Sequence, residues 1–420
     1  MSFLFKRIFI INIIVILLIS SRSYILADDK IENVNITETE EIIETVAEAS
    51  EIPKINSRYA VVIERNSKAI LYGKNELTKT KMASTTKIMT AIIVIENTNL
   101  NEIVEISSKA AGTGGSRLKI KKGDKISVKD LLYGLMLRSG NDAAVALAEY
   151  VGGSINGFGE LMNKKALELG LNNTHFETPH GLDSENHYTT PYELAILTDY
   201  ALKNETFAKI VGTISCTISV NGISRAIGNT NELLGYLNGV YGVKTGFTNG
   251  AGRCLVTSIK RENLDIICVV LGADTKKIRT TDSVKLIEYT FSNFENININ
   301  EIIKKEFENW KQINEGRITI EKGIKNGIKI KLDEYDIKNY PIEKGTENQI
   351  SIEIQCNKEF MAPIQENNKI GKLIVLYNNQ PIHEINILTA ETVRKKGIKD
   401  YILEIIKNYG SYLEKTITVK

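Results

Sequence analysis

The sequence has few of the residues that cross-link chains or hold metals. It contains four cysteines, four histidines and six prolines among 420 residues. The cysteines, with no Cys-x-x-Cys pair among them, are Cys216, Cys254, Cys268 and Cys356. No disulfide can be assigned from this spacing, and three of the four lie in strand-like segments, where cysteine is usually a small buried side chain. The histidines show no HExxH or comparable ligand spacing, so we predict no bound metal.

The chain also lacks a strong excess of charge. Its 53 basic and 51 acidic residues give a formal net charge of +2. This balance gives no argument for a nucleic-acid partner, and we predict none. The hydrophobic fraction of 42% is ordinary for globular proteins, and the length allows two or three domains.

The N-terminus predicts export. Two basic residues precede an apolar run over 8–19, interrupted only by Asn12, which polar and small residues follow as far as Ala27. This pattern predicts a signal peptide over 1–27 that is cleaved after Ala27. An uncleaved anchor helix is the alternative, although the run is short for a membrane span. Either interpretation places the rest of the chain outside the cytoplasm, beginning with a glutamate-rich, acidic linker over 28–57.

Strand and helix signals alternate after the linker. Residues 58–75 predict a β-hairpin, and residues 251–261 and 264–273 predict two further strands joined by a tight turn. Helical patterns fill the intervening segments and return over 280–294. We therefore predict an α/β (α+β) domain over 58–296, in which one antiparallel sheet is flanked by helices.

The pattern changes after residue 296. Short alternating strands separated by turn residues predict a small all-β domain over 297–388. The tail, 389–420, predicts an amphipathic helix with apolar residues at helical spacing and lysines on the other face. Two interpretations remain open for this helix: it packs on the β domain, or it lies on an anionic membrane surface.

Three short motifs could carry chemistry. They are Ser84-Thr85-Thr86-Lys87, Ser139-Gly140-Asn141 and Lys244-Thr245-Gly246. Each is weak alone, but together and in this order they are typical of serine β-lactamases and penicillin-binding proteins. The middle motif is SGN where that set often has SDN.

The spacing of these residues is chemically coherent. Positions i and i+3 share a helix face, so Lys87 can reach the hydroxyl of Ser84. A serine hydroxyl becomes a good nucleophile when a neighbouring base takes its proton, and lysine can be that base when burial and nearby positive charge, such as that of Lys244, lower its pKa. Ser139 could relay a proton to the leaving group, and Asn141 could bind the substrate backbone. The alternative for this motif is a helix break with Asn141 as the cap.

Residues 58–388 resemble the low-molecular-mass penicillin-binding proteins that are D-alanyl-D-alanine carboxypeptidases, serine peptidase family S11. Besides the three motifs, the segments 178–195, 228–235 and 239–256 carry the resemblance. Members of this family have a β-rich domain after the catalytic domain. They often end in an amphipathic helix at the membrane.

The resemblance implies roles for the first two motifs. Ser84 would be the acylated nucleophile and Lys87 the general base. Ser139 and Asn141 would orient the substrate and relay protons.

The resemblance also implies that the third motif binds the substrate. Lys244 and Thr245 would hold the substrate carboxylate, with Gly246 completing the motif. The backbone N–H groups of Ser84 and Phe247 would form the oxyanion hole. Family members often have histidine at the position of Phe247; a backbone donor survives that change, whereas a side-chain role does not.

Three residues outside the motifs follow from the same resemblance. Arg279 falls where the family places an arginine that pairs with the terminal carboxylate. An arginine suits this role because it can bind a carboxylate through two hydrogen bonds. The alternative is that Arg279 is a solvated charge at the start of a helix. His180 and Asp183 are assigned to loop structure rather than to catalysis.

The implied reaction removes the terminal D-Ala from the pentapeptide stem of peptidoglycan through an acyl-enzyme, without a cofactor. β-Lactams would acylate Ser84 as inhibitors, and the enzyme would act outside the cytoplasm, secreted and associated with the outer face of the membrane.

The sequence bears on three alternative functions. A class A-like β-lactamase should have a glutamate in an ExxLN-type loop, which the sequence lacks between its second and third motifs, and it would leave 297–420 unexplained. A D,D-endopeptidase acting on cross-links is a related enzyme. A non-catalytic cell-wall scaffold conflicts with the intact Ser84, Lys87 and Lys244.

Overall fold

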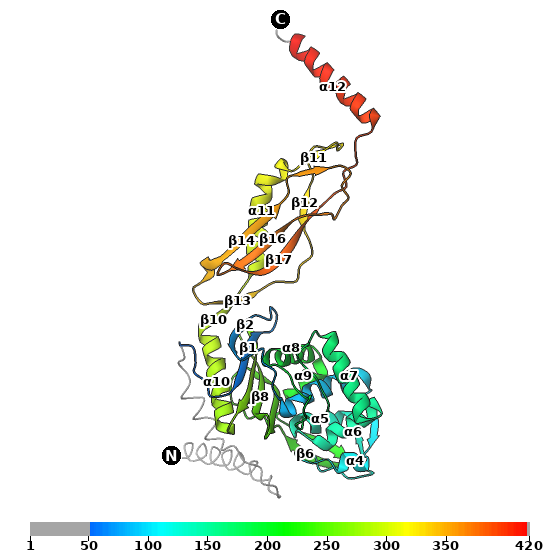
Figure 1. The fold of residues 1–420 in the computed structure, drawn as a ribbon, viewed down its shortest axis with the longest axis vertical. Helices are drawn as coiled ribbons and strands as arrows, with labels where there is room; N and C mark the ends of the chain where they lie inside the picture. The colour runs from blue at the N-terminus through cyan, green and yellow to red at the C-terminus, as the bar shows by residue number, and fades with distance from the viewer. Residues whose placement is uncertain (1–50, 418–420) are drawn as a thin grey trace, which may run out of the picture.

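The computed structural model describes residues 51–417, with side chains through residue 410. The signal peptide predicted over 1–27, and most of the linker predicted over 28–57, lie outside the described residues. An α/β domain is followed by a β domain and then by a terminal helix, which confirms the predicted fold class (Figure 1).

One antiparallel sheet draws its strands from both ends of the first domain. The strand order is β2-β1-β9-β8-β7. The strands are β1 (Tyr59–Glu64), β2 (Ile70–Lys74), β7 (Val240–Thr248), β8 (Gly252–Arg261) and β9 (Leu264–Ala273). The predicted hairpins and their shared sheet are confirmed. The strand β7 lies at an edge of this sheet and faces the helical part of the domain.

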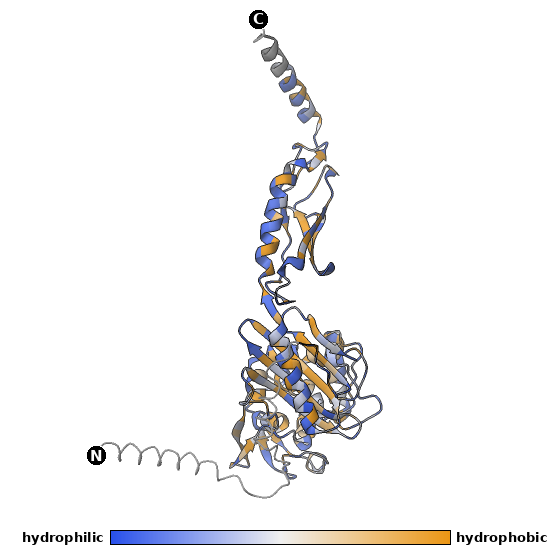
Figure 2. Ribbon diagram, turned by 90° about the vertical axis from the view of Figure 1, so that its left-hand side faces the viewer, coloured by the Kyte–Doolittle hydropathy of each residue, from blue (hydrophilic) through white to orange (hydrophobic). Residues whose placement is uncertain are grey.

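Helices cover both faces of this sheet. Alternate residues of β1 face opposite sides, so that Val61 and Ile63 join one core whereas Ala60 and Val62 join another. The second core is closed by α10 (Lys276–Asn293). The first core is closed by α3 (Lys87–Asn97), α5 (Val128–Leu137), α6 (Asn141–Gly152), α7 (Ile155–Glu168), α8 (Pro191–Leu202) and α9 (Glu205–Val211). The central strands are apolar on both faces, as Figure 2 shows, because both faces are covered.

Short elements surround the helical layer. The one-turn helix α4 (Ser108–Ala111) precedes a long loop. Two small hairpins pair β3 (Ile103–Glu105) with β4 (Lys125–Ser127), and β5 (Ser215–Val220) with β6 (Ile223–Gly228). The predicted helix break is confirmed, since α5 ends at Leu137 and α6 begins at Asn141.

The four cysteines are free thiols in the structure. Cys254 and Cys268 are buried in β8 and β9, and burial raises the pKa of both thiols. They behave as the small buried side chains predicted for strand segments.

The second domain contains a helix that the sequence analysis left unassigned. This helix, α11 (Ile299–Asn314), buries Ile299, Ile303 and Phe307 against the strands. The strands are β11 (Thr319–Glu321), β12 (Ile330–Leu332), β13 (Tyr340–Glu343), β14 (Ile350–Cys356), β15 (Glu359–Met361), β16 (Lys369–Tyr377) and β17 (Gln380–Thr389), with a main sheet in the order β12-β17-β16-β14. A short strand, β10 (Phe294–Ile297), pairs with β13 and contains residues 296 and 297, between which the domain boundary is predicted.

The terminal helix α12 spans Ile398–Ile417, so it begins later than residue 389. The segment before it stays on the β domain, because the amide of Ala390 donates to the carbonyl of Lys329 and Val393 forms a β-bridge with Ile364. The helix then extends away from the β domain (Figure 1). Over residues 51–417, the helices are all too short or too polar to cross a membrane.

Candidate active site

Ser84 and Lys87 lie where the chain enters its central helix. Ser84 is on a 3-10 turn, η1 (Ala83–Thr86), that continues directly into α3. The three-residue spacing brings Lys87 Nζ to 2.9 Å from Ser84 Oγ, as the motif predicts. Ser84 is partly exposed, whereas Lys87 is 0% exposed. A surface hydroxyl is therefore in contact with a buried amine.

The amine of Lys87 is held by two further acceptors. Nζ donates to Asn141 Oδ1 at 2.7 Å and to the backbone carbonyl of His180 at 2.8 Å. Burial lowers the pKa of Lys87 well below its usual range, and the charge of Lys244 lowers it further, while Asp142 opposes the shift. The environment therefore favours the neutral amine that a general base requires.

The second motif forms the turn between α5 and α6. Ser139 adopts φ 57° and is buried, a sparsely populated conformation for a residue other than glycine. The capping residue of α6 is Gly140, and Asn141 is the first helical residue, so the alternative of Asn141 as the cap is wrong. Asn141 instead donates through its backbone N–H to Ser116 O at 2.7 Å and through Nδ2 to Gly114 O at 2.8 Å.

The third motif lies on the edge strand β7. Lys244 is 1% exposed, and burial together with the charge of Arg279 lowers the pKa of Lys244 to about 7. Its Nζ donates to the carbonyl of Thr245 at 3.1 Å. The hydroxyl of Thr245 lies 2.8 Å from that of Thr230, a contact that the sequence analysis did not predict.

Gly246 allows β7 to approach the turn that carries the serine. A Cβ atom at this position would lie 3.0 Å from the backbone nitrogen of Ser84 and 3.3 Å from that of Thr85. The close approach places the Ser84 amide beside the strand that continues to Phe247. The Phe247 side chain is 47% exposed, with the guanidinium of Arg253 at 4.0 Å from its ring centroid.

Arg279 is at the start of α10 and is 3% exposed. It forms an ion pair with Glu232, which also accepts a hydrogen bond from Thr280 Oγ1 at 2.5 Å. The burial excludes the alternative of a solvated charge. Its partner Glu232 was not predicted, although it lies in the segment 228–235 that carries the resemblance.

The loop of residues 178–187 supports the site from the other side. Burial and the charge of Lys87 lower the pKa of His180 to about 3, so the imidazole ring is neutral. The backbone carbonyl of His180 accepts the hydrogen bond from Lys87 Nζ. Asp183 accepts from Thr248 Oγ1 at 2.7 Å and from the Gly250 amide at 2.9 Å, which fixes the end of β7.

Gly181, in the same loop, has φ +84°, and a Cβ there would lie 1.9 Å from the Ala83 carbonyl oxygen. Only glycine allows this approach to η1. Within residues 51–417, no three His, Cys, Asp or Glu side chains are grouped to hold a metal ion.

Comparisons with known proteins agree with this architecture. The family model described as D-alanyl-D-alanine carboxypeptidase, peptidase S11, matches residues 45–275, and that of the penicillin-binding protein 5 C-terminal domain matches 304–395. The D-alanyl-D-alanine carboxypeptidase DacF of Bacillus subtilis is 34% identical over 370 residues, which are 85% of this chain and 90% of that protein.

Solved structures show the same domains. Penicillin-binding protein 5 of Haemophilus influenzae superposes with a TM-score of 0.69 at 30% identity, covering 83% of this chain and 100% of that one. The carboxypeptidase DacD of Francisella tularensis superposes with a TM-score of 0.64 at 26% identity, covering 84% and 97%. The family match, the two-domain likeness and the three motifs gathered around Ser84 and Lys87 lead to one conclusion: the chain belongs to the D-alanyl-D-alanine carboxypeptidases of serine peptidase family S11, the low-molecular-mass penicillin-binding proteins.

Proposed function

We propose that this enzyme removes the terminal D-Ala from peptidoglycan pentapeptide stems through an acyl-enzyme on Ser84. One observation carries the proposal: Ser84 Oγ lies 2.9 Å from the amine of a fully buried Lys87 whose pKa is lowered. A serine next to a neutral amine is equipped for nucleophilic attack near neutral pH.

The contacts of Lys87 suit a neutral amine. Two N–H bonds donate to Asn141 Oδ1 and the His180 carbonyl, which leaves the lone pair of nitrogen directed at Ser84. Lys87 takes the hydroxyl proton as Oγ bonds to the carbonyl carbon of the penultimate D-Ala. The backbone N–H groups of Ser84 and Phe247 stabilise the oxyanion. When the tetrahedral intermediate collapses, the C–N bond breaks and the amine of D-Ala leaves with a proton relayed through Ser139.

The third motif would bind the end of the substrate. Lys244 and Thr245 hold the terminal carboxylate, and binding an anion favours the charged form of Lys244, whose pKa burial has lowered. Arg279 adds positive charge beside Lys244. Its Nε is a buried donor without a hydrogen-bond partner among the described residues, which supports a role toward a carboxylate. Gly246 keeps this strand against the nucleophile.

Water then hydrolyses the acyl-enzyme with Lys87 again as the base, releasing the shortened stem. A β-lactam would acylate Ser84 in the same way, but its opened ring remains attached and blocks the site. The substrate therefore leaves, whereas the antibiotic stays.

The place of action is part of the proposal. The apolar N-terminal run supports export by a signal peptide. The exposed apolar residues of α12 support attachment to the outer face of the membrane. The division into two domains near residue 296 is supported by separate hydrophobic cores, of which the second extends to Val393, beyond the predicted end at residue 388.

Intact-mass spectrometry of the full chain mixed with penicillin tests the nucleophile. We expect a stable adduct of one penicillin on the wild type and none on Ser84→Ala, while Ser351→Ala, an exposed serine on β14, keeps the adduct. A D-Ala release assay on a pentapeptide completes the test. Rapid penicillin hydrolysis without an adduct would instead support a β-lactamase. Cleavage of cross-linked stems without D-Ala release would support an endopeptidase, and no reaction at all would support a scaffold.

A further inference from the structure

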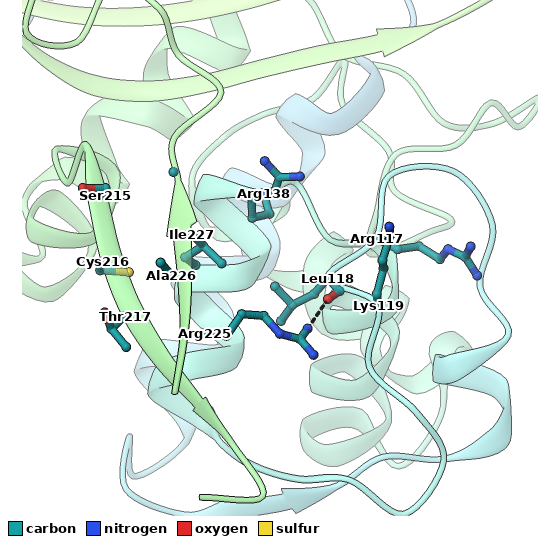
Figure 3. A pocket seen from close by; sticks show the side chains of 11 residues that line it. Arg117, Leu118, Lys119, Arg138, Ser215, Cys216, Thr217, Arg225, Ala226 and Ile227 are labelled. Atoms are coloured by element: carbon teal, nitrogen blue, oxygen red, sulfur yellow. Dashed lines mark hydrogen bonds between the residues drawn. The ribbon is translucent and has the colours of Figure 1, made fainter. Parts of the chain in front are cut away.

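A pocket of about 600 Å³ lies beside the second motif (Figure 3). Its walls come from the loop after α4, the end of α5 and the hairpin β5–β6. Four cationic residues line it, and its lining includes no carboxylate: the cations are Arg117, Lys119, Arg138 and Arg225. Ser215 and Thr217 add hydroxyl groups from β5. This volume is within the range of small-molecule sites, about 300–1,000 Å³.

Two of the arginines are partly buried and belong to rigid elements. Arg225, on β6, donates through Nη1 to the Leu118 carbonyl at 2.6 Å, which ties the hairpin to the opposite wall. Arg138 is the C-cap residue that follows α5, and it directly precedes Ser139. Figure 3 shows the Arg225 side chain directed toward Leu118 and the Arg138 side chain at the end of α5, whereas Arg117 extends outward along the loop.

The charges of the three arginines are not neutralised by a carboxylate of the described residues. In the described part of the chain, no ion pair joins Arg117, Arg138 or Arg225 to a carboxylate. The nearby Asp142 is fully buried and accepts hydrogen bonds from the amides of Leu118 and Ile120. Its carboxylate is therefore bonded to the loop backbone and not to the arginines of the pocket. Positive charge concentrated in a concave site attracts an anion.

The pocket adjoins the catalytic residues through two links. On the loop side, Ser116 accepts from the amide of Asn141, a residue that contacts Lys87. On the hairpin side, Gly228 lines the pocket two residues before Thr230, whose amide donates to Leu137 O and whose hydroxyl contacts Thr245. A stem bound between the second and third motifs can therefore reach the pocket.

We infer that this pocket is a subsite for a free carboxylate of the stem peptide, upstream of the scissile D-Ala-D-Ala bond. The inference rests on the proposed function and names which stems the enzyme prefers: those whose upstream carboxylate is free rather than amidated. A guanidinium recognises a carboxylate by paired hydrogen bonds, which a carboxamide cannot accept equally well. Phosphate groups of wall polymers share the negative charge, but the stem is the ligand that the adjoining catalytic residues would hold next to the pocket.

The test compares two synthetic pentapeptides that end in D-Ala-D-Ala and differ only in a carboxylate or a carboxamide on the second residue. For the wild-type full chain, kcat/KM for D-Ala release should favour the carboxylate by about five- to tenfold. Added salt should reduce this ratio, because the pocket is open to solvent. Arg138→Gln and Arg225→Gln should each bring the ratio toward one, whereas Arg317→Gln, an exposed arginine of the β domain, should leave it unchanged.

The ratio of kcat/KM for the two peptides separates recognition of the carboxylate from structural damage, because a distorted active site lowers kcat/KM for both peptides together. Equal rates for the two peptides on the wild type would overturn the subsite and leave the proposed function standing. No D-Ala release from either peptide would overturn the proposed function itself. A carboxylate preference that survives in both arginine variants would place recognition elsewhere. Binding of inorganic phosphate in the pocket, without any preference for the carboxylate peptide, would assign the pocket to phosphate groups. This result would also overturn the inference.

Discussion

Lys87 is an amine without exposed surface, close to a second buried amine, that of Lys244. Burial penalises the charged form of each group, and the charge of Lys244 penalises that of Lys87 further. The charge of Asp142 opposes this shift in the pKa of Lys87, but the oxygens of Asp142 already accept hydrogen bonds from backbone amides. The site therefore produces its base by desolvation first and by repulsion second.

Removing the charge of Lys244 should move the pH profile of acylation. The reactive form of Lys87 is neutral, so its fraction at a given pH increases as its pKa falls. In Lys244→Gln the repulsion is absent, the pKa of Lys87 rises, and the acidic limb of the profile shifts to higher pH. The measurement is the rate of acylation by a fluorescent penicillin across the pH range, which reports the limb position separately from any loss of affinity.

Lys260→Gln is the matched control, since Lys260 is an exposed lysine on the neighbouring strand β8. Its profile should coincide with that of the wild type. An acidic limb that stays in place in Lys244→Gln would show that burial alone sets the pKa of Lys87.

At this scale, the sequence predicted the residues but not all of their partners. The three-residue spacing of Ser84 and Lys87 was sufficient to predict their contact. The carbonyl of His180 could not be predicted, because any residue type offers a carbonyl and the loop position is set by tertiary packing. Glu232 was also missed, since the ion pair joins residues 47 positions apart in sequence.

Among the elements, β7 and η1 are in direct contact and set the width of the site. The edge strand carries the third motif, and the turn carries the nucleophile. Their backbones approach closely because Gly246 has no side chain. The oxyanion donors proposed at Ser84 and Phe247 depend on this approach.

Gly246→Ala should therefore slow acylation without unfolding the protein. Its Cβ would be 3.0 Å from the Ser84 nitrogen and 3.2 Å from Ala83 Cβ, so the turn and the strand must separate by a few tenths of an ångström. Misplacing one oxyanion donor should lower the acylation rate constant by about tenfold to a hundredfold. Stopped-flow acylation, together with thermal unfolding, measures the two effects.

Gly316→Ala provides the control, because nothing lies within 4 Å of a Cβ built at Gly316. It should acylate at the wild-type rate. If Gly246→Ala also acylates at that rate, the spacing between β7 and η1 does not position the oxyanion donors.

The elements with local signals were the ones predicted from sequence. Tight turns and alternating apolar residues identified the hairpins of the main sheet, and the Ser139-Gly140-Asn141 break identified the ends of α5 and α6. The helix α11 was left unassigned although Ile299, Ile303 and Phe307 follow a four-residue spacing, because the surrounding residues are mostly charged or polar. The start of α12 depends on β-bridges to the β domain, which local sequence does not encode.

The whole molecule places the active site and the terminal helix in different parts of an extended arrangement (Figure 1). The two domains are joined through the pair β10–β13 and by reciprocal hydrogen bonds between Asn263 and Asn296, at 2.9 and 2.8 Å. Beyond the β domain, the first turns of α12 are fixed by ion pairs of Arg394 with Asp400 and of Lys396 with Glu404. Such an arrangement can hold a catalytic domain away from the membrane surface to which we propose that α12 attaches.

The exposed side of α12 makes that attachment testable. Ile398, Ile402 and Ile405 are exposed, the last at 68%, and no part of the β domain covers them in the described residues. Because two of the nearby cations are already paired with acids of the helix, apolar burial rather than charge should provide most of the binding energy. The full chain should therefore float with phosphatidylglycerol vesicles and, more weakly, with phosphatidylcholine vesicles.

Ile405→Glu should reduce the partition coefficient for vesicles by about tenfold or more, while Gln312→Glu on α11 adds the same charge without effect. Equal flotation of Ile405→Glu and wild type would instead indicate that this face of α12 does not meet the membrane, and would favour a protein partner for the exposed helix.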